Sequence, residues 1–320
     1  MTRREDAVRA FVLIVLAIVA VDIVIPPGFG PLALGEIFEP YLAVAAILAG
    51  FAVFRTLAFW SRGLVIVLLA VALARYGPSW VSFPPQPAAQ PLRIATWNVL
   101  AGDLGRERAL RGIAASDADL IGLQELTPDV GRALDADATD FDHRVLPMHP
   151  GDPDVGLLSR YPVLESVYSR EPAVLRAVVQ LPAAPTVAYV IHPPLGRFET
   201  FAGIPVSVNI AVRDAALAII RTRIDEDLAA GRSVIVMGDF NATEREPAFG
   251  QLAAGLRDAH LDAGTGPGFT WRPAPMSRLP FGLLRIDYVL STPDFITTSS
   301  TVDCTLPSDH CRLDVGLTAR

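Results

Sequence analysis

The sequence Val234-Ile235-Val236-Met237-Gly238-Asp239-Phe240-Asn241 is an apolar run that ends on a glycine, a carboxylate and an amide. Such a run, closed by a turn signal, is typical of a strand. Two other runs end similarly, since Ile94 to Trp97 precedes Asn98 and Leu120 to Leu123 precedes Gln124 and Glu125. One ending of this kind indicates only a helix cap or a turn. Their recurrence indicates a common crevice, because ligand sites gather beyond the strand ends of helix-covered sheets.

Short apolar runs alternate with helical patterns along residues 92–320. The expected strands are Leu92–Trp97, Leu120–Gln124, Val155–Ser159, Ala177–Leu181, Thr186–Ile191, Ser233–Met237, Arg285–Leu290 and Arg312–Leu317. The expected helices are Arg106–Ala115, Pro128–Leu134 and Val212–Ala230. The sequence therefore predicts an α/β or α+β domain with many strands.

Further polar side chains accompany these runs. If the chain stays extended beyond Gly238, Asp239 and Asn241 project to the same side and can address one ligand. The segment Arg285-Ile286-Asp287-Tyr288 alternates likewise and places Asp287 opposite Tyr288. Ser308-Asp309-His310 follows beside the last apolar run. Carboxylates with a histidine are what a hard divalent cation and acid/base chemistry require.

Taken together, these blocks resemble the endonuclease/exonuclease/phosphatase superfamily, which includes pancreatic deoxyribonuclease, apurinic endonucleases, inositol polyphosphate 5-phosphatases and neutral sphingomyelinases. The matching motifs, in the family's order and spacing, are Trp97-Asn98, Gln124-Glu125, Gly238-Asp239-Phe240-Asn241, Arg285-Ile286-Asp287-Tyr288 and Ser308-Asp309-His310. His192 matches the family's other histidine. Trp271 also fits the pattern, either as a pocket wall or as core packing. The resemblance covers residues 92–320, and several blocks in register are more specific than any single motif.

The resemblance implies a four-layer sandwich, in which two face-to-face β-sheets are flanked by helices, and metal-dependent hydrolysis of a phosphoester bond. By this resemblance Glu125 is the principal ligand of Mg²⁺ (or Mn²⁺). Asn98 assists it and so, directly or through water, does Asp309. The metal would polarise a phosphoryl oxygen and stabilise the charge that develops in the transition state.

The same resemblance implies the roles of the other matched residues. Asp239 would orient or deprotonate the attacking water, and Asn241 would hold water or a phosphate oxygen. His310, oriented by Asp287, and His192 would donate hydrogen bonds to the phosphate and assist the leaving group, with either of them as the general acid. Histidines outside the matched blocks are expected to be solvated or structural; these are His143, His149 and His260.

The first quarter of the chain holds most of the excess hydrophobicity of a sequence that is 51% hydrophobic and 19% charged. Apolar runs cover residues 11–25, 41–54 and 64–74, and each reaches the roughly 20 residues of a membrane span if flanking arginines snorkel. We expect three transmembrane helices. Arginines lie before the first run and between the second and third, whereas the loop between the first two runs holds Glu36 and Glu39 and no Arg. This bias predicts a cytoplasmic N-terminus and places everything after the third helix outside the cytoplasm.

Alternatives stay open in this region. The third run can form a re-entrant hairpin with the second, which would change the sidedness. A cleaved signal peptide would account for neither of the two later runs. Asp22 marks either a functional intramembrane carboxylate or, because it lies near the outer end of its helix, an interfacial position.

The sequence thus predicts a membrane anchor at residues 1–76, a Pro-rich linker at 77–91 and one catalytic domain at 92–320. All 27 basic residues are Arg, and the net charge is -7. Six Arg and five acidic residues fall within residues 1–75, so the rest of the chain carries -8, which disfavours bulk DNA as a partner. Cys304 and Cys311 bracket Asp309 and His310 and form either a disulfide or two free thiols.

An acidic catalytic domain on a membrane anchor favours a substrate in or near the membrane. The three N-terminal helices resemble those of bacterial family members associated with resistance to glycopeptide antibiotics, which implies a lipid-linked phosphate or pyrophosphate or a phospholipid head group. The alternative is a tethered nuclease acting on extracellular DNA, which needs a basic rim; the available arginines are Arg272, Arg278 and Arg285. A catalytically silent binding module would lack Glu125, Asp239 or His310, and all three are present.

Overall fold

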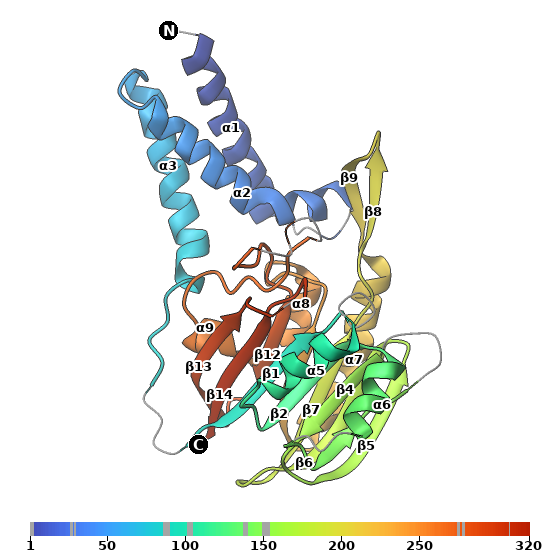
Figure 1. The fold of residues 1–320 in the computed structure, drawn as a ribbon. Helices are drawn as coiled ribbons and strands as arrows, with labels where there is room; N and C mark the ends of the chain where they lie inside the picture. Colours follow the sequence, from blue (N-terminus) through green and yellow to red (C-terminus); the bar gives the residue numbers. More distant parts are fainter. Residues whose placement is uncertain are drawn as a thin grey trace. The chain divides into compact units, whose positions relative to one another are not determined.

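A computed structural model describes residues 3–25, 28, 30–85, 90–100, 105–136, 140–148, 154–273, 276, 279–306 and 308–320. The chain forms two compact units, whose elements are labelled in Figure 1. The helical unit comprises Met1–Trp80, Gly196–Ala211 and Arg245–Pro247. The sandwich unit comprises Val81–Leu195, Val212–Glu244 and Ala248–Arg320.

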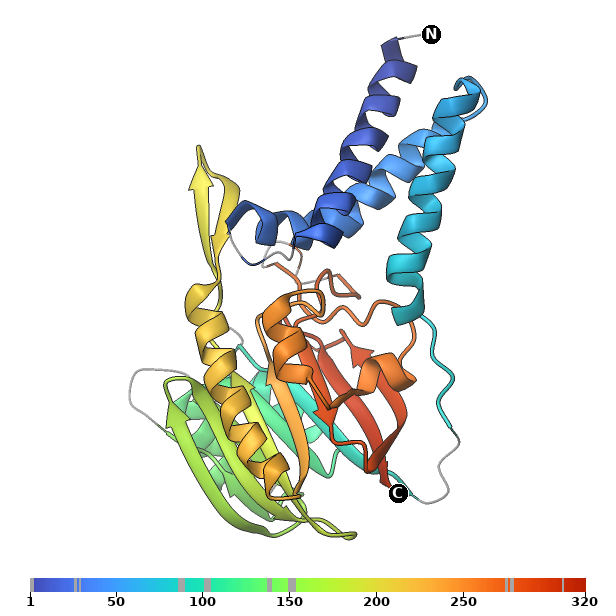
Figure 2. The same cartoon turned by 180° about the vertical axis from the view of Figure 1, so that it is seen from behind.

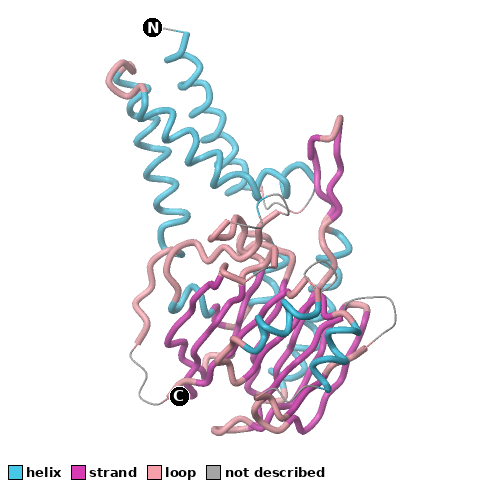
Figure 3. The backbone as a smooth tube through the Cα atoms, viewed as in Figure 1, coloured by secondary structure: helices cyan, strands magenta, loops and turns pink. Residues whose placement is uncertain are grey.

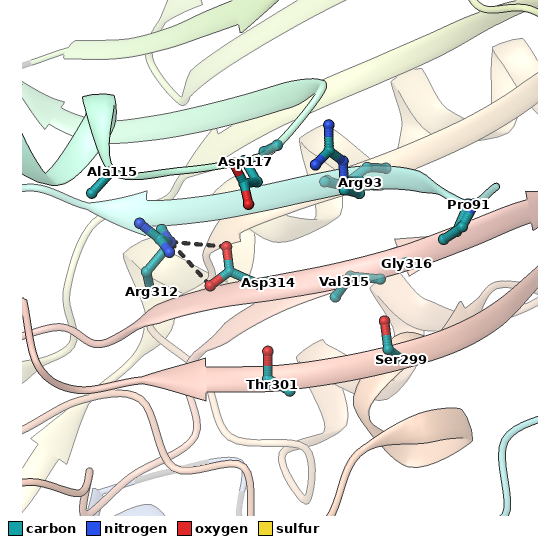
Figure 4. Close-up of a pocket in the computed structure, with 12 residues that line it drawn as sticks. Pro91, Arg93, Ala115, Asp117, Ser299, Thr301, Arg312, Asp314, Val315 and Gly316 are labelled. Carbon is teal, nitrogen blue, oxygen red and sulfur yellow. Dashed lines mark hydrogen bonds and ion pairs between the residues drawn. The ribbon is translucent and has the colours of Figure 1, made fainter.

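Two six-stranded sheets form the centre of the sandwich unit (Figure 3). The first, in spatial order, contains β13 (Phe295–Asp303), β14 (Arg312–Ala319), β1 (Leu92–Asn98), β2 (Leu120–Leu126), β4 (Asp154–Ser159) and β3 (His143–Val145). The second contains β11 (Arg257–Asp258), β12 (Asp287–Ser291), β10 (Ser233–Asp239), β7 (Pro185–His192), β6 (Ala173–Gln180) and β5 (Val163–Arg170). Neighbouring strands are antiparallel except for the parallel pairs β1/β2 and β7/β10.

The two sheets pack face to face through a core of buried aliphatic side chains, among them Ile94, Val190 and Leu313. The sheets approach each other closely at Gly122, where a Cβ atom would lie 2.7 Å from the Met237 side chain. A larger residue at this position would therefore have to displace the Met237 side chain.

Helices cover the outer faces of both sheets. α5 (Arg106–Ala114) and α6 (Pro128–Ala136) pack on the first sheet, and α7 (Ala211–Ala229) and α8 (Pro247–Ala253) on the second, as Figure 2 shows for α7. A short helix, α9 (Ala259–Ala263), lies against β12 and β13. The order helix, sheet, sheet, helix confirms the predicted four-layer sandwich.

The helical unit contains α1 (Arg3–Val24), α2 (Gly30–Ala52) and α3 (Phe59–Tyr76), followed by the single 3₁₀ turn η1 (Gly77–Ser79). Each of the three α-helices is long and apolar enough to cross a membrane. A two-stranded hairpin of β8 (Arg197–Phe201) and β9 (Ile204–Asn209) belongs to the same unit and packs on α2.

One expectation for this unit is wrong, because Glu36 and Glu39 lie inside α2 and not in a loop. The helix begins early because proline is tolerated in a first turn, where Pro31 stands. Both carboxylates are buried and paired: Glu36 lies 2.6 Å from Arg245, and Glu39 lies 2.9 Å from Arg75. Arg75 also pairs with Asp22, which joins the last turns of α1 and α3.

Candidate active site

The predicted site residues lie at strand ends and neighbouring loops of the two sheets. Asn98 ends β1, Glu125 lies near the end of β2, His192 ends β7, Asp239 ends β10 and Asp287 begins β12. Asp239 and Asp287 are direct cross-strand partners. The polar endings read from the sequence therefore meet at one edge of the sandwich, because they belong to paired strands of two packed sheets.

Asn98 joins the two sheets at this edge. Its side chain is fully buried, and its Nδ2 donates hydrogen bonds to Glu125 Oε1 at 3.0 Å and to Asp239 Oδ2 at 3.1 Å. Its Oδ1 accepts a hydrogen bond from the backbone N–H of Leu100. One amide thus holds together carboxylates that come from different sheets.

Glu125 stands in an unusual backbone conformation. Its φ is +54°, in the left-handed region, and the pairing of β2 with β4 shifts register between Leu123 and Leu126 around it. Such conformations cost free energy for a residue with a Cβ atom and persist only when the surroundings hold them. Here the bulge turns the Glu125 carboxylate, whose side chain is 27% exposed, toward Asn98.

Two imidazoles converge on Asp239. His192 Nε2 lies 3.7 Å from Asp239 Oδ2 and 3.9 Å from Glu125 Oε1. His310 Nε2 lies 3.6 Å from the same Asp239 oxygen, and its Nδ1 lies 2.9 Å from Asp287 Oδ2. The Asp287 carboxylate fixes the orientation of the His310 ring, which leaves Nε2 directed at the centre of the site.

The charges of the site perturb one another. Burial raises the pKa of Asp239, and nearby Asp287 raises it further against the opposing effect of His310. Burial also raises the pKa of Asp309, and so does the negative charge of Glu125. Burial alone would lower the pKa of His310, but Asp287 and Asp239 outweigh it and raise that pKa to about 10. These directions describe carboxylates crowded into a poorly solvated space.

This donor set fits a divalent cation. Asp239, Asp287 and His310 offer ligand atoms that all lie within 4.8 Å of one another. Asp287 Oδ1 is buried and has no hydrogen-bond partner among the described residues. Mg²⁺ and Mn²⁺ bind preferentially where several carboxylate oxygens lie close together and are not all neutralised by positively charged side chains. In the present arrangement Asn98 turns its nitrogen to the carboxylates, so it can contribute an oxygen ligand only after its amide rotates by half a turn.

Asn241 is placed differently from the sequence expectation. The chain does not stay extended beyond Asp239, because β10 ends there and Asn241 has a φ of +51°. Its backbone N–H donates to Asp239 Oδ1 at 2.9 Å, and its side-chain Nδ2 donates to Pro193 O at 2.9 Å. The turn depends on Gly238, whose φ is +147° and where a Cβ atom would lie 2.1 Å from Ile191 O.

A buried arginine that the sequence did not assign to the site supports the loop that carries Asp309 and His310. Arg272 is 1% exposed, and its backbone N–H donates to Asp309 O at 2.8 Å. Its guanidinium donates to the carbonyl oxygens of Leu279, Cys304, Leu306 and Ser308. Cys304 and Cys311 form a disulfide across the same loop. The loop is therefore restrained both by the hydrogen bonds of Arg272 and by the disulfide.

These positions remove Arg272 from the arginines available for an exposed basic rim. Arg285 is also buried, at 2% exposed, where it pairs with Asp258 and lies over the Tyr288 ring at 4.7 Å. Arg278 lies outside the described residues. The sequence shows the residue type of each arginine but not that packing would bury two of them.

Residues outside the matched blocks lie as follows. His260 is buried, with Nδ1 3.3 Å from Ser300 Oγ and Nε2 3.1 Å from Gly266 O, which is a structural environment. His143 begins β3, and His149 lies outside the described residues. Trp271 bridges by its backbone to His310 and is half-buried beside the site.

Solved structures with the same fold come from several organisms. An endonuclease/exonuclease/phosphatase from Bacteroides vulgatus matches with a TM-score of 0.56 and 20% identity, covering 72% of this chain and 100% of that one. A mannosyl-6-phosphatase from Bacteroides thetaiotaomicron matches with a TM-score of 0.56 and 14% identity, covering 71% and 99%. TDP2 from D. rerio, solved with a single-strand DNA product, matches with a TM-score of 0.56 and 21% identity, covering 72% and 100%. At these identities the likeness concerns the fold.

No curated protein matches the chain. The sequence pattern of the Endonuclease/Exonuclease/phosphatase family matches residues 95–310. That span begins in β1 and ends on His310, so it includes the second sheet, most of the first sheet apart from β14, and the strand ends at which the acidic and histidine side chains meet. The chain therefore belongs to the endonuclease/exonuclease/phosphatase family, whose members are hydrolases.

Proposed function

We propose that this protein is a membrane-anchored phosphoester hydrolase that requires a divalent cation, Mg²⁺ or Mn²⁺, and whose sandwich unit lies outside the cytoplasm. The observation that carries the proposal is that Glu125 and Asp239 meet at the amide of Asn98, while His192 and His310 converge on Asp239. Carboxylates and imidazoles on rigid strand ends are what hydrolysis of a phosphoester needs.

In this proposal Glu125 is the principal metal ligand, with Asn98 and, directly or through water, Asp309. When bound, the cation supplies positive charge to a phosphoryl oxygen. Asp239 orients the attacking water or accepts its proton, since both imidazoles approach its Oδ2. Asn241, fixed by Pro193, holds water or a phosphate oxygen near Asp239.

The two histidines act on the phosphate itself. His310 donates from Nε2, because Asp287 engages Nδ1. His192, whose Nε2 lies near both Glu125 and Asp239, donates from Nε2 beside the same Asp239 oxygen. One of the two gives a proton to the leaving oxygen.

The proposed anchor consists of α1 to α3. It corresponds to the predicted anchor at residues 1–76, which a linker at 77–91 joins to a catalytic domain at 92–320. The distribution of arginines around the spans supports an outer location for the catalytic domain. The Cys304–Cys311 disulfide supports the same location, because disulfides persist in oxidising compartments.

We further propose a substrate at the membrane, either a lipid-linked phosphate or pyrophosphate or a phospholipid head group. The charge of -8 on residues 76–320 and the burial of Arg272 and Arg285 support this choice over a DNA duplex. The alternative is a tethered nuclease on extracellular DNA, and the single-strand DNA product bound by TDP2 of D. rerio makes it worth testing.

The test uses the full-length protein in detergent with Mg²⁺. Phosphate release from undecaprenyl pyrophosphate is compared with nicking of plasmid DNA, for the wild type and Glu125→Ala, with Asp262→Ala as a matched loss of charge outside the site. Glu125-dependent phosphate release without nicking supports the proposed substrate class. Glu125-dependent nicking without phosphate release would replace it by the nuclease.

A further inference from the structure

The hairpin of β8 and β9 is a separate two-stranded sheet. Its turn, Ala202-Gly203, has φ values of +50° and +79°, the conformation of a tight turn that matches strand twist. A hairpin of two strands is marginally stable in water unless its face packs on something. The stability of this hairpin therefore depends on what packs against it.

The base of the hairpin is supported by α2. Val208 and Ile210 form a buried cluster with Ala33 and Leu34 in the first turns of that helix. Gly30 approaches so closely that a Cβ atom there would lie 2.9 Å from Ser207 Oγ. The base is thus fixed to the end of a helix that we propose to span the membrane.

The distal half of the hairpin has no such cover among the described residues. Phe201 and Ile204, which face each other beside the turn, are 76% and 66% exposed, and Phe198 and Val206 are 43% and 46% exposed. Residues 200–212 contain no charged side chain. An exposed apolar patch of this kind marks an interaction surface.

The position of the patch within the helical unit indicates its partner. The first turns of α2, which hold the hairpin, precede Glu39, and at Glu39 the last turns of α1 and α3 meet at one end of the helical bundle, joined by the pairs of Arg75 with Asp22 and Glu39. In Figures 1 and 2 the hairpin tip points to the side on which the three helices extend from this end. An apolar tip beside a membrane-spanning bundle, directed along it, enters the hydrocarbon edge of the same bilayer.

We infer that residues 197–209 form an accessory membrane contact, which buries Phe201 and Ile204 in the outer leaflet. The inference rests on the proposed membrane anchor and adds a second lipid-binding element to it. Arg197 and Glu199 stay toward the base, at the level of the head groups. Only residues 193–196 separate the hairpin from His192 along the chain.

The test measures depth in the membrane with a nitroxide label on the full-length protein in phosphatidylcholine/phosphatidylglycerol nanodiscs. Both native cysteines are in the disulfide, so an introduced Ala202→Cys offers the free thiol. Ile66→Cys, 53% exposed on α3, is the reference inside the bilayer, and Ala229→Cys, exposed on α7, is the aqueous reference. We expect the labels at 202 and 66 to be accessible to oxygen and shielded from a nickel chelate, and the label at 229 to show the reverse.

A second variant tests whether the apolar side chains of the tip cause the membrane contact. Phe201→Ser with Ile204→Ser in the Ala202→Cys protein removes the apolar tip, and the label at 202 should then lose its shielding from nickel. The inference is overturned if the label at 202 behaves like that at 229 while the label at 66 is shielded, or if the double substitution leaves the shielding at 202 unchanged. If the label at 66 is also aqueous, the anchor itself is wrong and the accessory contact is excluded with it.

Discussion

His310 and Asp287 form a buried hydrogen-bonded pair, with Nδ1 of the histidine 2.9 Å from Oδ2 of the aspartate. Asp287 begins β12, whereas His310 comes from the disulfide-closed loop before β14, so the pair ties the two sheets together. The pairing leaves Nε2 of His310 facing Asp239 at 3.6 Å. The ring orientation on which the proposed chemistry depends is therefore set by one carboxylate.

Asp287→Asn should lower kcat by roughly 10³-fold or more, because an amide stabilises neither the His310 imidazolium nor the required tautomer. KM should change little, since Asp287 is fully buried and does not reach a substrate. Steady-state kinetics with bis(p-nitrophenyl) phosphate measures both. Asp262→Asn is the matched control, and a kcat within about threefold of wild type in Asp287→Asn would remove the orienting role.

Arg272 and the Cys304–Cys311 disulfide should support the Asp309–His310 loop redundantly. Replacing both cysteines by Ala should leave kcat within about threefold, because Arg272 still holds the carbonyl oxygens of Cys304, Leu306 and Ser308. Arg272→Lys should lose most of these hydrogen bonds and lower kcat by roughly tenfold. In the variant that combines the cysteine and Arg272 substitutions, kcat should fall by far more than the product of the two separate fold-changes. Purely multiplicative losses in this cycle would show that the two devices act independently.

Cation binding should stabilise the folded protein. A ligand that binds only the native state at about 100 times its Kd adds roughly 2.7 kcal/mol, so Mn²⁺ should raise Tm by several degrees. Glu125→Gln should lose most of this shift, and Asp262→Asn should retain it. Differential scanning fluorimetry in detergent, with and without a chelator, makes the comparison. If Mn²⁺ raised the Tm of Glu125→Gln as much as that of the wild type, Glu125 would not be a ligand, and the cation would be assigned to Asp239, Asp287 and His310.

Asp227 should make stability depend on acid pH. Burial would raise its pKa, but hydrogen bonds from Arg176, Tyr189 and Arg232 outweigh this and lower that pKa to about 2, below the unfolded value of 3.8. Its contribution is thus complete above about pH 4 and is lost as the pH falls from 4 toward 2. Asp227→Asn should destabilise by about 3 kcal/mol at pH 7, because Arg176, Tyr189 and Arg232 lose the charge of the buried carboxylate to which they donate.

The measurement is the difference in Tm between wild type and Asp227→Asn as a function of pH. The difference should be constant from pH 7 to 5 and should shrink as the pH falls below 4. A difference that persists unchanged at pH 2.5 would show that packing, and not charge, accounts for the effect of the substitution.

Much of the fold can be predicted from the sequence where burial is continuous. β1, β2 and β10 are apolar on both faces because each lies between a second sheet and a helical layer, so their runs are unbroken. β13, Phe295–Asp303, was missed because this edge strand is rich in Thr and Ser. The hairpin 197–209 was missed because its apolar side chains are exposed and its support comes from α2, far away in sequence.

The site residues could be predicted to share a crevice, because strand register brings strand ends together. The orientation of their side chains could not be predicted from the sequence. The left-handed backbone of Glu125 and Asn241 and the turning of the Asn98 nitrogen toward two carboxylates arise from packing between sheets. Arg272 carried no sequence signal for its position, since an arginine that binds only backbone carbonyls leaves no motif. The roles assigned to Asn98, Glu125 and Asp309 as ligands stay predictions.

The most direct test of the central claim is the rate of bis(p-nitrophenyl) phosphate hydrolysis by the full-length protein in detergent, with Mg²⁺ or Mn²⁺ and after chelation. We expect turnover that disappears with the chelator, returns with the cation, and falls by roughly 10³-fold or more in Glu125→Gln and Asp239→Asn, with Asp262→Asn unaffected. Turnover that survives both chelation and the loss of Glu125 would contradict a cation-dependent hydrolase at this site.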